Sequence, residues 1–290
     1  MIGAMFAIAG VTGNTGKVVA DTLLAKNHAI RVIVRNKNKG AQWKGRGAEI
    51  AEASLDDAVS LGRALKGVEG AYVLLPPDAT TTDFFGSRAA MIDAIGQAAM
   101  DAGVPHLVFL SSIGAHVPKG HGPIGAPYRA ERAFRTLGIG TTFVRAAYFL
   151  ENYGTVLAAA KSDGVLPSFL PAHFVHSVVT TTDIGRIAAQ ALLDGPRGQR
   201  IVELSGPADI TPADVAVILT ELLGRSVTVV EAPLDAVVPT FMSFGISQHM
   251  SEVYREMYAG LINGVVTWEN TGERIRGSID AKEGLRALIS

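Results

Sequence analysis

The chain has 290 residues, with 26 basic and 27 acidic side chains and a formal net charge of −1. At roughly 150 residues per domain, this length predicts about two domains. The near-neutral balance argues against a nucleic-acid partner, which favours a basic surface, and gives no support to electrostatic attachment to a membrane. The absence of cysteine excludes disulfides, thiolate catalysis and cysteine-ligated metal sites, and it fits a cytoplasmic protein.

Neither targeting nor membrane insertion is expected from the sequence. The first residues, Met1 to Met5, contain no basic region, so they are not expected to form a signal peptide. The stretch from Gly164 to Thr182 carries no formal charge, but it contains two prolines, two histidines and several hydroxyl groups. Such a stretch is not expected to span a membrane. The composition predicts a globular protein rich in apolar residues.

Short apolar strands alternate with helical segments through the first half of the chain. The predicted strands are Met5–Ala9, Ile30–Val34, Ala71–Leu75, Leu107–Leu110 and Thr141–Arg145. The predicted helices are Lys17–Lys26, Leu55–Leu65, a long helix capped by Thr82 or Asp83 that runs to Ala102, and Tyr128–Leu137. Strands that are apolar on both faces and separated by helices favour a parallel sheet covered on both sides. The predicted fold class is therefore α/β, a Rossmann-like, doubly wound parallel sheet with right-handed crossovers.

The rhythm changes after Arg145. The predicted helices are Glu151–Lys161, Asp183–Leu193, a capped helix that begins at Thr211 and ends at Gly224, and Ser247–Ile262. The predicted strands are His176–Thr180, Ile201–Leu204 and Ser226–Glu231, and Gly164–Ala172 is expected to be irregular. We expect a larger domain over residues 1–150 and a smaller α/β substrate-binding domain over residues 151–290. One or two elements of the second are expected to return to the first.

A glycine-rich turn joins the first predicted strand to the first helix. The sequence Gly10-Val11-Thr12-Gly13-Asn14-Thr15-Gly16 has the spacing GxxGxxG. A helix N-terminus in this position presents backbone N–H groups to a pyrophosphate. Gly10 allows the tight turn, Gly13 lets the backbone approach the phosphates, and Gly16 lets the helix pack close to the strand. The motif predicts that residues 1–150 form an NAD(P)-binding domain.

The residue after the second strand indicates which dinucleotide is preferred. An acid there accepts a hydrogen bond from the ribose 2′-hydroxyl of NAD. This chain has Arg35 instead, followed by Lys37 and Lys39. A guanidinium can bind a 2′-phosphate with two hydrogen bonds, so NADP(H) is predicted over NAD(H).

The order of motifs resembles the NmrA-like family of atypical short-chain dehydrogenases/reductases, and most of all its bacterial quinone-reductase and azoreductase-like members. The residues that carry the resemblance are the glycine turn, Arg35, Ser54-Leu55-Asp56-Asp57, Gly67-Val68-Glu69-Gly70, Leu74-Leu75-Pro76-Pro77, Phe109-Leu110-Ser111-Ser112, Glu131, Arg145, Tyr148-Phe149-Leu150-Glu151-Asn152, Ser205-Gly206-Pro207, Thr211-Pro212 and Leu223-Gly224-Arg225. The resemblance covers nearly the whole chain.

The resemblance also implies roles for individual residues. It assigns to the cofactor Gly10, Thr12, Gly13, Asn14, Thr15 and Gly16 at the pyrophosphate, Arg35 at the 2′-phosphate, Leu55 and Asp56 at the adenine, Leu75, Pro76 and Pro77 at the ribose, and Ser111, Ser112, Tyr148, Phe149 and Asn152 at the nicotinamide.

The proton relay of typical short-chain dehydrogenases is missing. Those enzymes use a Tyr and a Lys four residues later. If Glu131 is aligned with the acid that follows this Lys, the two positions hold Pro123 and Pro127; if Tyr128 is taken as the Tyr, Arg132 replaces the Lys. The proton donor therefore stays open, and the candidates are Tyr128, Tyr148 and His116. His121, His173 and His176 are further possible donors, and no metal site is expected at His173 and His176, which have no third ligand nearby.

Reduction of a quinone or an azo bond needs hydride delivery more than a tuned acid. An aromatic slot could be lined by Tyr148, Phe149, Phe169, Phe174 and Phe241. The prediction is an NADPH-dependent oxidoreductase of a small electron-poor acceptor, as a monomer or homodimer. The alternatives are a non-catalytic NADP(H) sensor that regulates a protein partner, and a reductase of aromatic secondary metabolites. Phe241–Tyr258 could be a lid, a dimer contact or ordinary core.

Overall fold

An eight-stranded sheet organises the molecule in the computed structural model, which describes residues 4–289 and leaves Met1 to Gly3 outside. The strands are β1 (Met5–Ala9), β2 (Ala29–Val34), β3 (Glu49–Glu52), β4 (Gly70–Val73), β5 (His106–Ser112), β6 (Gly140–Ala146), β10 (Gln199–Ser205) and β13 (Glu273–Arg276). Their order is β13-β10-β6-β5-β4-β1-β2-β3, and all neighbours are parallel. The predicted doubly wound parallel sheet is confirmed.

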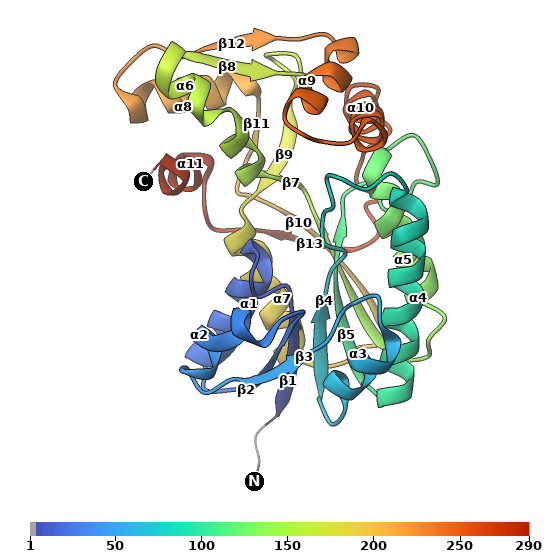
Figure 1. The fold of residues 1–290 in the computed structure, drawn as a ribbon. Helices are drawn as coiled ribbons and strands as arrows, with labels where there is room; N and C mark the ends of the chain where they lie inside the picture. Colours follow the sequence, from blue (N-terminus) through green and yellow to red (C-terminus); the bar gives the residue numbers. More distant parts are fainter. Residues whose placement is uncertain (1–3, 290) are drawn as a thin grey trace.

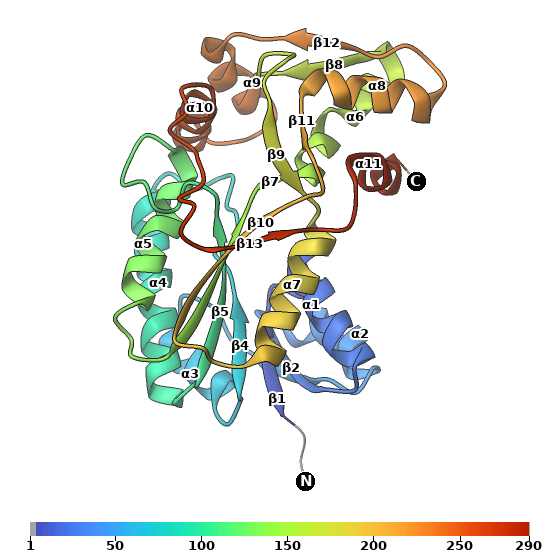
Figure 2. The ribbon, with the colours of Figure 1, turned by 180° about the vertical axis from the view of Figure 1, so that it is seen from behind.

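Helices cover both faces of this sheet, as Figures 1 and 2 show. One face carries α1 (Asn14–Ala25), α2 (Ala41–Lys44) and α7 (Thr181–Asp194), and the other carries α3 (Ala58–Leu65), α4 (Phe84–Ala102) and α5 (Gly125–Phe134). The six inner strands are largely apolar because their side chains pack into one of two cores, whereas the edge strands β3 and β13 carry exposed charged residues and were not predicted from the sequence. Side-chain caps begin two helices where the sequence predicts: Asp83 accepts from the backbone N–H of Gly86, and Thr211 from that of Asp214.

A smaller lobe lies above the carboxyl ends of the strands (Figure 1). It contains a sheet of β7 (Tyr148–Phe149), β9 (His176–Val179) and β11 (Asp209–Ile210), and a pair of strands, β8 (Val165–Ser168) and β12 (Thr228–Glu231). Its helices are α6 (Leu157–Asp163), α8 (Pro212–Leu223), α9 (Val237–Ser243), α10 (Gln248–Ile262) and α11 (Ala281–Ile289). Short 3-10 turns are η1 (Lys37–Gly40), η2 (Gly122–Ile124), η3 (Leu150–Val156) and η4 (Leu234–Ala236).

Two predictions for this lobe were wrong in detail. Gly164–Ala172 was expected to be irregular, but Val165–Ser168 pairs in parallel with β12. That partner lies about sixty residues later in the chain, so the local pattern with its prolines gives no sign of it. The helix expected over Glu151–Lys161 begins as the 3-10 turn η3 and becomes α-helical only at Leu157.

Strands from the second half of the chain return to the large sheet. β10 pairs with β6, and β13 pairs with β10 at the edge. The division of the chain near residue 150 stays a prediction. Within residues 4–289, no helix is both long and apolar enough to cross a membrane.

Helix α7 fixes the position of α1, which carries the glycine turn. Gly185 of α7 faces α1 so closely that a Cβ built there would lie 2.5 Å from the Cβ of Val18 and 2.9 Å from the carbonyl oxygen of Thr15. Because backbone cannot move aside as a flexible side chain can, only glycine permits this approach.

The substitution Gly185→Ala should therefore destabilise the fold by about 1–3 kcal/mol, as measured by urea unfolding. The matched control is Gly62→Ala in α3, where a Cβ would meet nothing closer than 3.9 Å. The free energy of unfolding of that control should rise by up to about 1 kcal/mol, because alanine has a higher helix propensity than glycine. Equal effects of the two substitutions would contradict the packing argument.

Candidate functional site

The residues predicted to hold a dinucleotide gather at one edge of the large sheet. Because the strands are parallel, their carboxyl ends meet there, and this edge is where ligands bind in such folds. Gly10–Gly16 follows β1, Arg35 follows β2, Leu75–Pro77 follows β4, and Ser112 ends β5. Tyr148 follows β6 and begins the smaller lobe. The edge thus lies between the two parts of the molecule.

The glycine turn has the geometry that the sequence predicts. Gly10 has φ +71°, a left-handed conformation that favours glycine, and it accepts a 2.9 Å hydrogen bond from the N–H of Gly13. A Cβ at Gly16 would overlap the carbonyl oxygen of Ala9 and lie 2.5 Å from that of Gly10. Glycine at these positions therefore lets α1 start directly against the end of β1.

The N-terminus of α1 is open to a ligand. Gly13 stands at its N-cap, where no side chain accepts from the first turn, and that turn holds no acid. A Cβ at Gly13 would meet only the carbonyl oxygen of Gly10, at 3.5 Å, so its other side is free. Thr12, Gly13 and Asn14 are exposed. Unpaired N–H groups at the positive end of a twelve-residue helix fit a pyrophosphate.

Thr15 differs from its neighbours in this turn. It is buried, and its hydroxyl accepts a 2.9 Å hydrogen bond from the hydroxyl of Tyr72 on β4. Burial raises the pKa of Tyr72, and this outweighs the opposite effect of Thr15, so the phenol stays protonated and remains the donor. The side chain of Thr15 therefore stabilises the turn from the protein interior through Tyr72 and is not available to a ligand.

Of the residues assigned to the adenosine, Leu55 is buried in the core, and the others lie in exposed or half-buried loops. Arg35 is exposed, whereas Lys37 lies 3.9 Å from Glu52 in a weak surface ion pair. Asp56 is exposed, and its neighbour Asp57 caps α3. Leu75 and Pro76 are half-buried, and Pro77 is exposed, as is Asn152 at the base of the smaller lobe. Ser112 is half-buried and donates to the carbonyl oxygen of Ile113.

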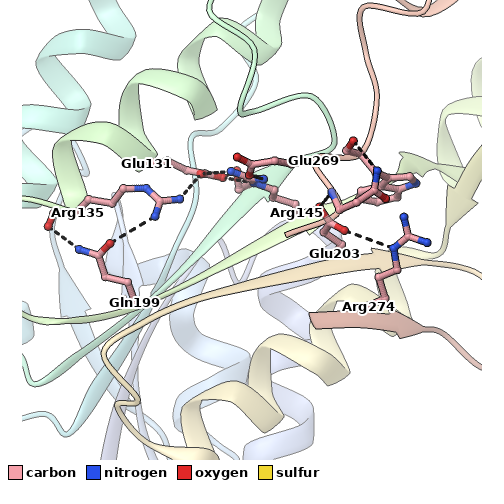
Figure 3. Close-up of polar contacts among 10 residues, drawn as sticks. Glu131, Arg135, Arg145, Gln199, Glu203, Glu269 and Arg274 are labelled. Carbon is pink, nitrogen blue, oxygen red and sulfur yellow. Dashed lines mark hydrogen bonds and ion pairs between the residues drawn. The ribbon is translucent and has the colours of Figure 1, made fainter. Parts of the chain in front are cut away.

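A buried ionic network lies behind the end of β5 (Figure 3). Arg145 of β6 binds Glu131 of α5 with two hydrogen bonds, from Nε to Oε1 at 2.8 Å and from Nη2 to Oε2 at 2.7 Å. Ser111, which is beside Arg145 in the strand register, donates to Oε1 of Glu131 at 2.6 Å. The hydroxyl of Ser111 is thus directed toward Glu131, and any contribution to a nicotinamide site would come through its position and backbone.

Two more charged side chains complete the network. Arg135 donates to Oε2 of Glu131 at 3.0 Å, and Arg145 also donates to Glu269, in the segment after α10. Burial lowers the pKa of Arg145, but the hydrogen bonds and charges of Glu131 and then Glu269 outweigh this and raise it. Burial likewise raises the pKa of Glu269, but Arg145 outweighs it and lowers the pKa overall. Glu269 had no signal in the sequence, because it lies far along the chain from its partner.

Aromatic side chains from four segments meet where the smaller lobe faces the sheet edge. The ring centroids are separated by 5.6 Å for Tyr148–His176, 6.0 Å for Phe174–His176, 5.3 Å for Phe169–Tyr258, 5.7 Å for Phe169–Phe241 and 5.3 Å for Phe241–Tyr254. We call these seven residues the aromatic cluster. Burial raises the pKa of Tyr148 and of Tyr258, whose hydroxyls share a hydrogen bond. Both phenols therefore keep their protons at neutral pH. Phe149 instead packs against the main core.

The structure also locates the other candidate proton donors. Tyr128 lies on α5 with the guanidinium carbon of Arg132 at 5.6 Å from its ring, a cation–π pair. His116 is in the loop after β5, and its buried Nδ1 has no hydrogen-bond partner. His176 contacts the hydroxyl of Tyr153 at 3.2 Å, and burial lowers its pKa. His173 is exposed, and the described residues contain no group of three side chains placed to hold a metal ion.

Comparison with known proteins agrees with this arrangement. Residues 4–268 match the model of the NmrA-like family. The chain belongs to the NmrA-like family. It is 30% identical to a (4-alkanoyl-5-oxo-2,5-dihydrofuran-3-yl)methyl phosphate reductase of Streptomyces griseus, over 82% of this chain and 81% of that one. It is 28% identical to an NAD(P)H azoreductase of Xenophilus azovorans, over 88% of this chain and 86% of that one.

A solved structure has the same fold. The NADPH-dependent quinone oxidoreductase from Escherichia coli, in complex with NADPH, superimposes with a TM-score of 0.82 at 24% identity. The match covers 99% of this chain and 100% of the other. The resemblance predicted from the order of motifs is confirmed at the level of the family and its fold.

The ionic network should be the most sensitive polar feature of this NmrA-like protein. The substitution Glu131→Gln leaves Arg145 buried with one carboxylate instead of two, and should cost about 3–5 kcal/mol in urea unfolding. The control is Glu273→Gln, which removes one of the two carboxylate partners of Arg200, the other being Asp194, in an ion pair at the surface. That control should cost about 1 kcal/mol or less. Similar losses for the two variants would show that burial of the network does not govern its contribution.

Proposed function

We propose that this protein is an NADPH-dependent oxidoreductase that reduces a small electron-poor acceptor such as a quinone or an azo compound. The observation that carries the proposal is the open N-terminus of α1 behind the Gly10–Gly16 turn, which fits a pyrophosphate. The relatives support it: one is named an NAD(P)H azoreductase, another is named a (4-alkanoyl-5-oxo-2,5-dihydrofuran-3-yl)methyl phosphate reductase, and the structural neighbour is an NADPH-dependent quinone oxidoreductase.

The cofactor residues are proposed from the sheet edge. The backbone of Gly10–Gly16 binds the pyrophosphate, and the exposed guanidinium of Arg35 pairs with the 2′-phosphate. The loops at Leu55–Asp56 and Leu75–Pro77 flank the adenosine, and Ser111 and Ser112 lie toward the nicotinamide with Tyr148 and Asn152. When bound, NADPH supplies a hydride to the acceptor.

The aromatic cluster is the proposed acceptor site. Planar rings offer stacking surfaces to a flat conjugated acceptor, and they exclude water from the hydride path. Quinone reduction needs a hydride and one proton. The protonated hydroxyls of Tyr148 and Tyr258 can donate a hydrogen bond to the oxygen that gains electron density, while water delivers the proton. His116 and Tyr128 remain alternative donors. The Tyr and Lys relay of alcohol dehydrogenases is not needed for such a reaction.

The setting of the protein is proposed from its charge and composition. A net charge of −1 gives no attraction to nucleic acid or to an anionic membrane, and the lack of cysteine fits the cytoplasm. We propose a cytoplasmic monomer or homodimer whose partner is its small-molecule acceptor.

The wild-type protein should bind NADPH and oxidise it when menadione or an azo dye is added, as followed by calorimetry and by nicotinamide absorbance. The variant Gly13→Val should lose at least about tenfold in NADPH affinity, because its side chain fills the space left for the phosphates. Gly13 has φ −105°, which valine adopts without strain, so the melting temperature should not change.

The outcome separates the candidate functions. Binding of NADPH without oxidation by any acceptor would favour a redox sensor that acts on a protein partner. No binding of either NADPH or NADH would contradict both functions, because both depend on the glycine turn.

Arg35 should set the preference between the two dinucleotides. The substitution Arg35→Gln should weaken NADPH about tenfold or more and leave NADH unchanged, because a charge-assisted hydrogen bond to phosphate is worth about 1.5–3 kcal/mol. Titration calorimetry with both cofactors measures this. The control Lys39→Gln removes a nearby exposed charge and should change NADPH binding little. A parallel loss of NADH affinity in Arg35→Gln would rule out recognition of the 2′-phosphate.

A further inference from the structure

One arginine near the ligand edge is buried without a partner for its charge. Arg88 lies one turn into α4 and is 5% exposed. Its Nε and Nη2 atoms are buried and have no hydrogen-bond partner. The guanidinium carbon lies 5.3 Å from the ring of Phe84, one turn earlier, so the side chain extends toward the N-terminus of α4. In Figure 1 this end of α4 points toward α10 of the smaller lobe.

The acidic groups nearest to Arg88 do not neutralise it. The guanidinium is influenced by the charges of Asp78 and Asp56, but neither carboxylate pairs with it in the described structure. Oδ1 of Asp78 instead accepts from the N–H and hydroxyl of Thr80, at 3.1 Å and 2.9 Å. Arg145, by comparison, is also buried but is paired with two carboxylates.

A buried guanidinium without a counter-charge indicates that an anionic partner is missing from the protein itself. Burial lowers the pKa of Arg88, and Asp78 and Asp56 only partly offset this, yet arginine does not lose its proton in proteins. Its charge persists, and an uncompensated buried charge is strongly unfavourable. The most direct compensation is an oxyanion, whose two oxygens can face the planar fork of N–H groups.

The surroundings of Arg88 indicate which ligand brings the oxyanion. The phosphate-binding turn belongs to α1, and α1 and α4 lie on opposite faces of the sheet (Figures 1 and 2). The ring of Tyr254 on α10 lies 5.3 Å from that of Phe241 in the aromatic cluster. Tyr254 is close enough to Arg88 for its charge to act on the phenol. Tyr254 also packs in one apolar cluster with Phe84 and with Leu75, which follows β4. Arg88 thus adjoins the aromatic cluster through Phe84 and Tyr254, and its helix lies on the opposite face of the sheet from α1. Asp56, which is assigned to the adenine, is also within electrostatic range.

We propose that Arg88 binds an anionic substituent of the acceptor, a sulfonate, carboxylate or phosphate, and so selects negatively charged aromatic substrates. The inference rests on the proposed function, because it places the acceptor at the aromatic cluster. The hydride chemistry itself does not involve Arg88. It acts on binding, and its removal should raise KM for anionic acceptors and leave kcat nearly unchanged.

The test compares two acceptors of similar size and electron demand that differ chiefly in charge: anthraquinone-2-sulfonate and its neutral sulfonamide. In Arg88→Gln, KM for the sulfonate should rise about tenfold or more, with KM for the neutral compound and the Kd of NADPH unchanged. Arg88→Lys keeps the positive charge but loses the planar fork of N–H groups. Its KM for the sulfonate should therefore lie between those of wild type and Arg88→Gln. The matched control is Arg129→Gln: Arg129 lies 5.2 Å from the ring of Phe85 but is exposed. It should behave as wild type.

A second readout does not need turnover. Calorimetry of anthraquinone sulfonate with the NADP⁺-saturated protein should show tight binding in wild type and a loss of about tenfold in Arg88→Gln. This arm keeps the inference testable even if no acceptor is reduced. Equal losses with both quinones, or a weaker affinity of Arg88→Gln for NADPH, would overturn the proposal. So would unchanged binding of the sulfonate. Melting temperatures of the variants identify any that fail to fold.

Discussion

The buried network of Arg145, Glu131 and Glu269 is the interaction on which the two halves of the protein depend. Arg145 is on a central strand, Glu131 is on a helix of one face, and Glu269 comes from the segment between α10 and β13. A charge at this depth is tolerated only when its partners are held in place. Folding of the strand, the helix and the late segment is therefore coupled through one guanidinium. The same network fixes Ser111 at the end of β5.

The ligand edge combines a rigid part with an adaptable part. Gly16 and Gly185 set the position of α1, because a Cβ at either would collide with backbone or Cβ atoms that cannot move aside. The aromatic cluster is assembled from loops and from α10, and its rings touch edge to face. The rigid glycine turn suits the cofactor, because the pyrophosphate to be bound always has the same shape. Acceptors of varied shape suit the aromatic cluster, because rings can tilt at small energetic cost.

The sequence predicted the inner strands of the sheet because each β-α unit carries its own signals: buried strands, caps such as Asp83 and Thr211, and the glycine turn. The edge strands β3 and β13 were missed, because they are short and largely exposed. The cofactor edge followed, since parallel strands align their carboxyl ends. The site assignments themselves stay predictions. Features that depend on partners far away in the sequence were not predicted. Strand β8 forms because it pairs with β12, and Glu269 matters because it binds Arg145. Arg88 was missed because its lack of hydrogen-bond partners for Nε and Nη2 is visible only in the folded structure. No local pattern records such relations.

The order of the strands has a consequence for synthesis. From the middle of the sheet to one edge, the neighbours β4, β5, β6, β10 and β13 follow their order along the chain. As the polypeptide leaves the ribosome, each strand can add to an edge that is already in place. The last addition is Glu273–Arg276, only shortly after Glu269 has appeared. A nascent chain stalled before Glu269 has a nearly complete sheet, but the buried Arg145 lacks its second carboxylate. Quality-control factors would therefore meet an almost complete domain with an incompletely paired buried charge.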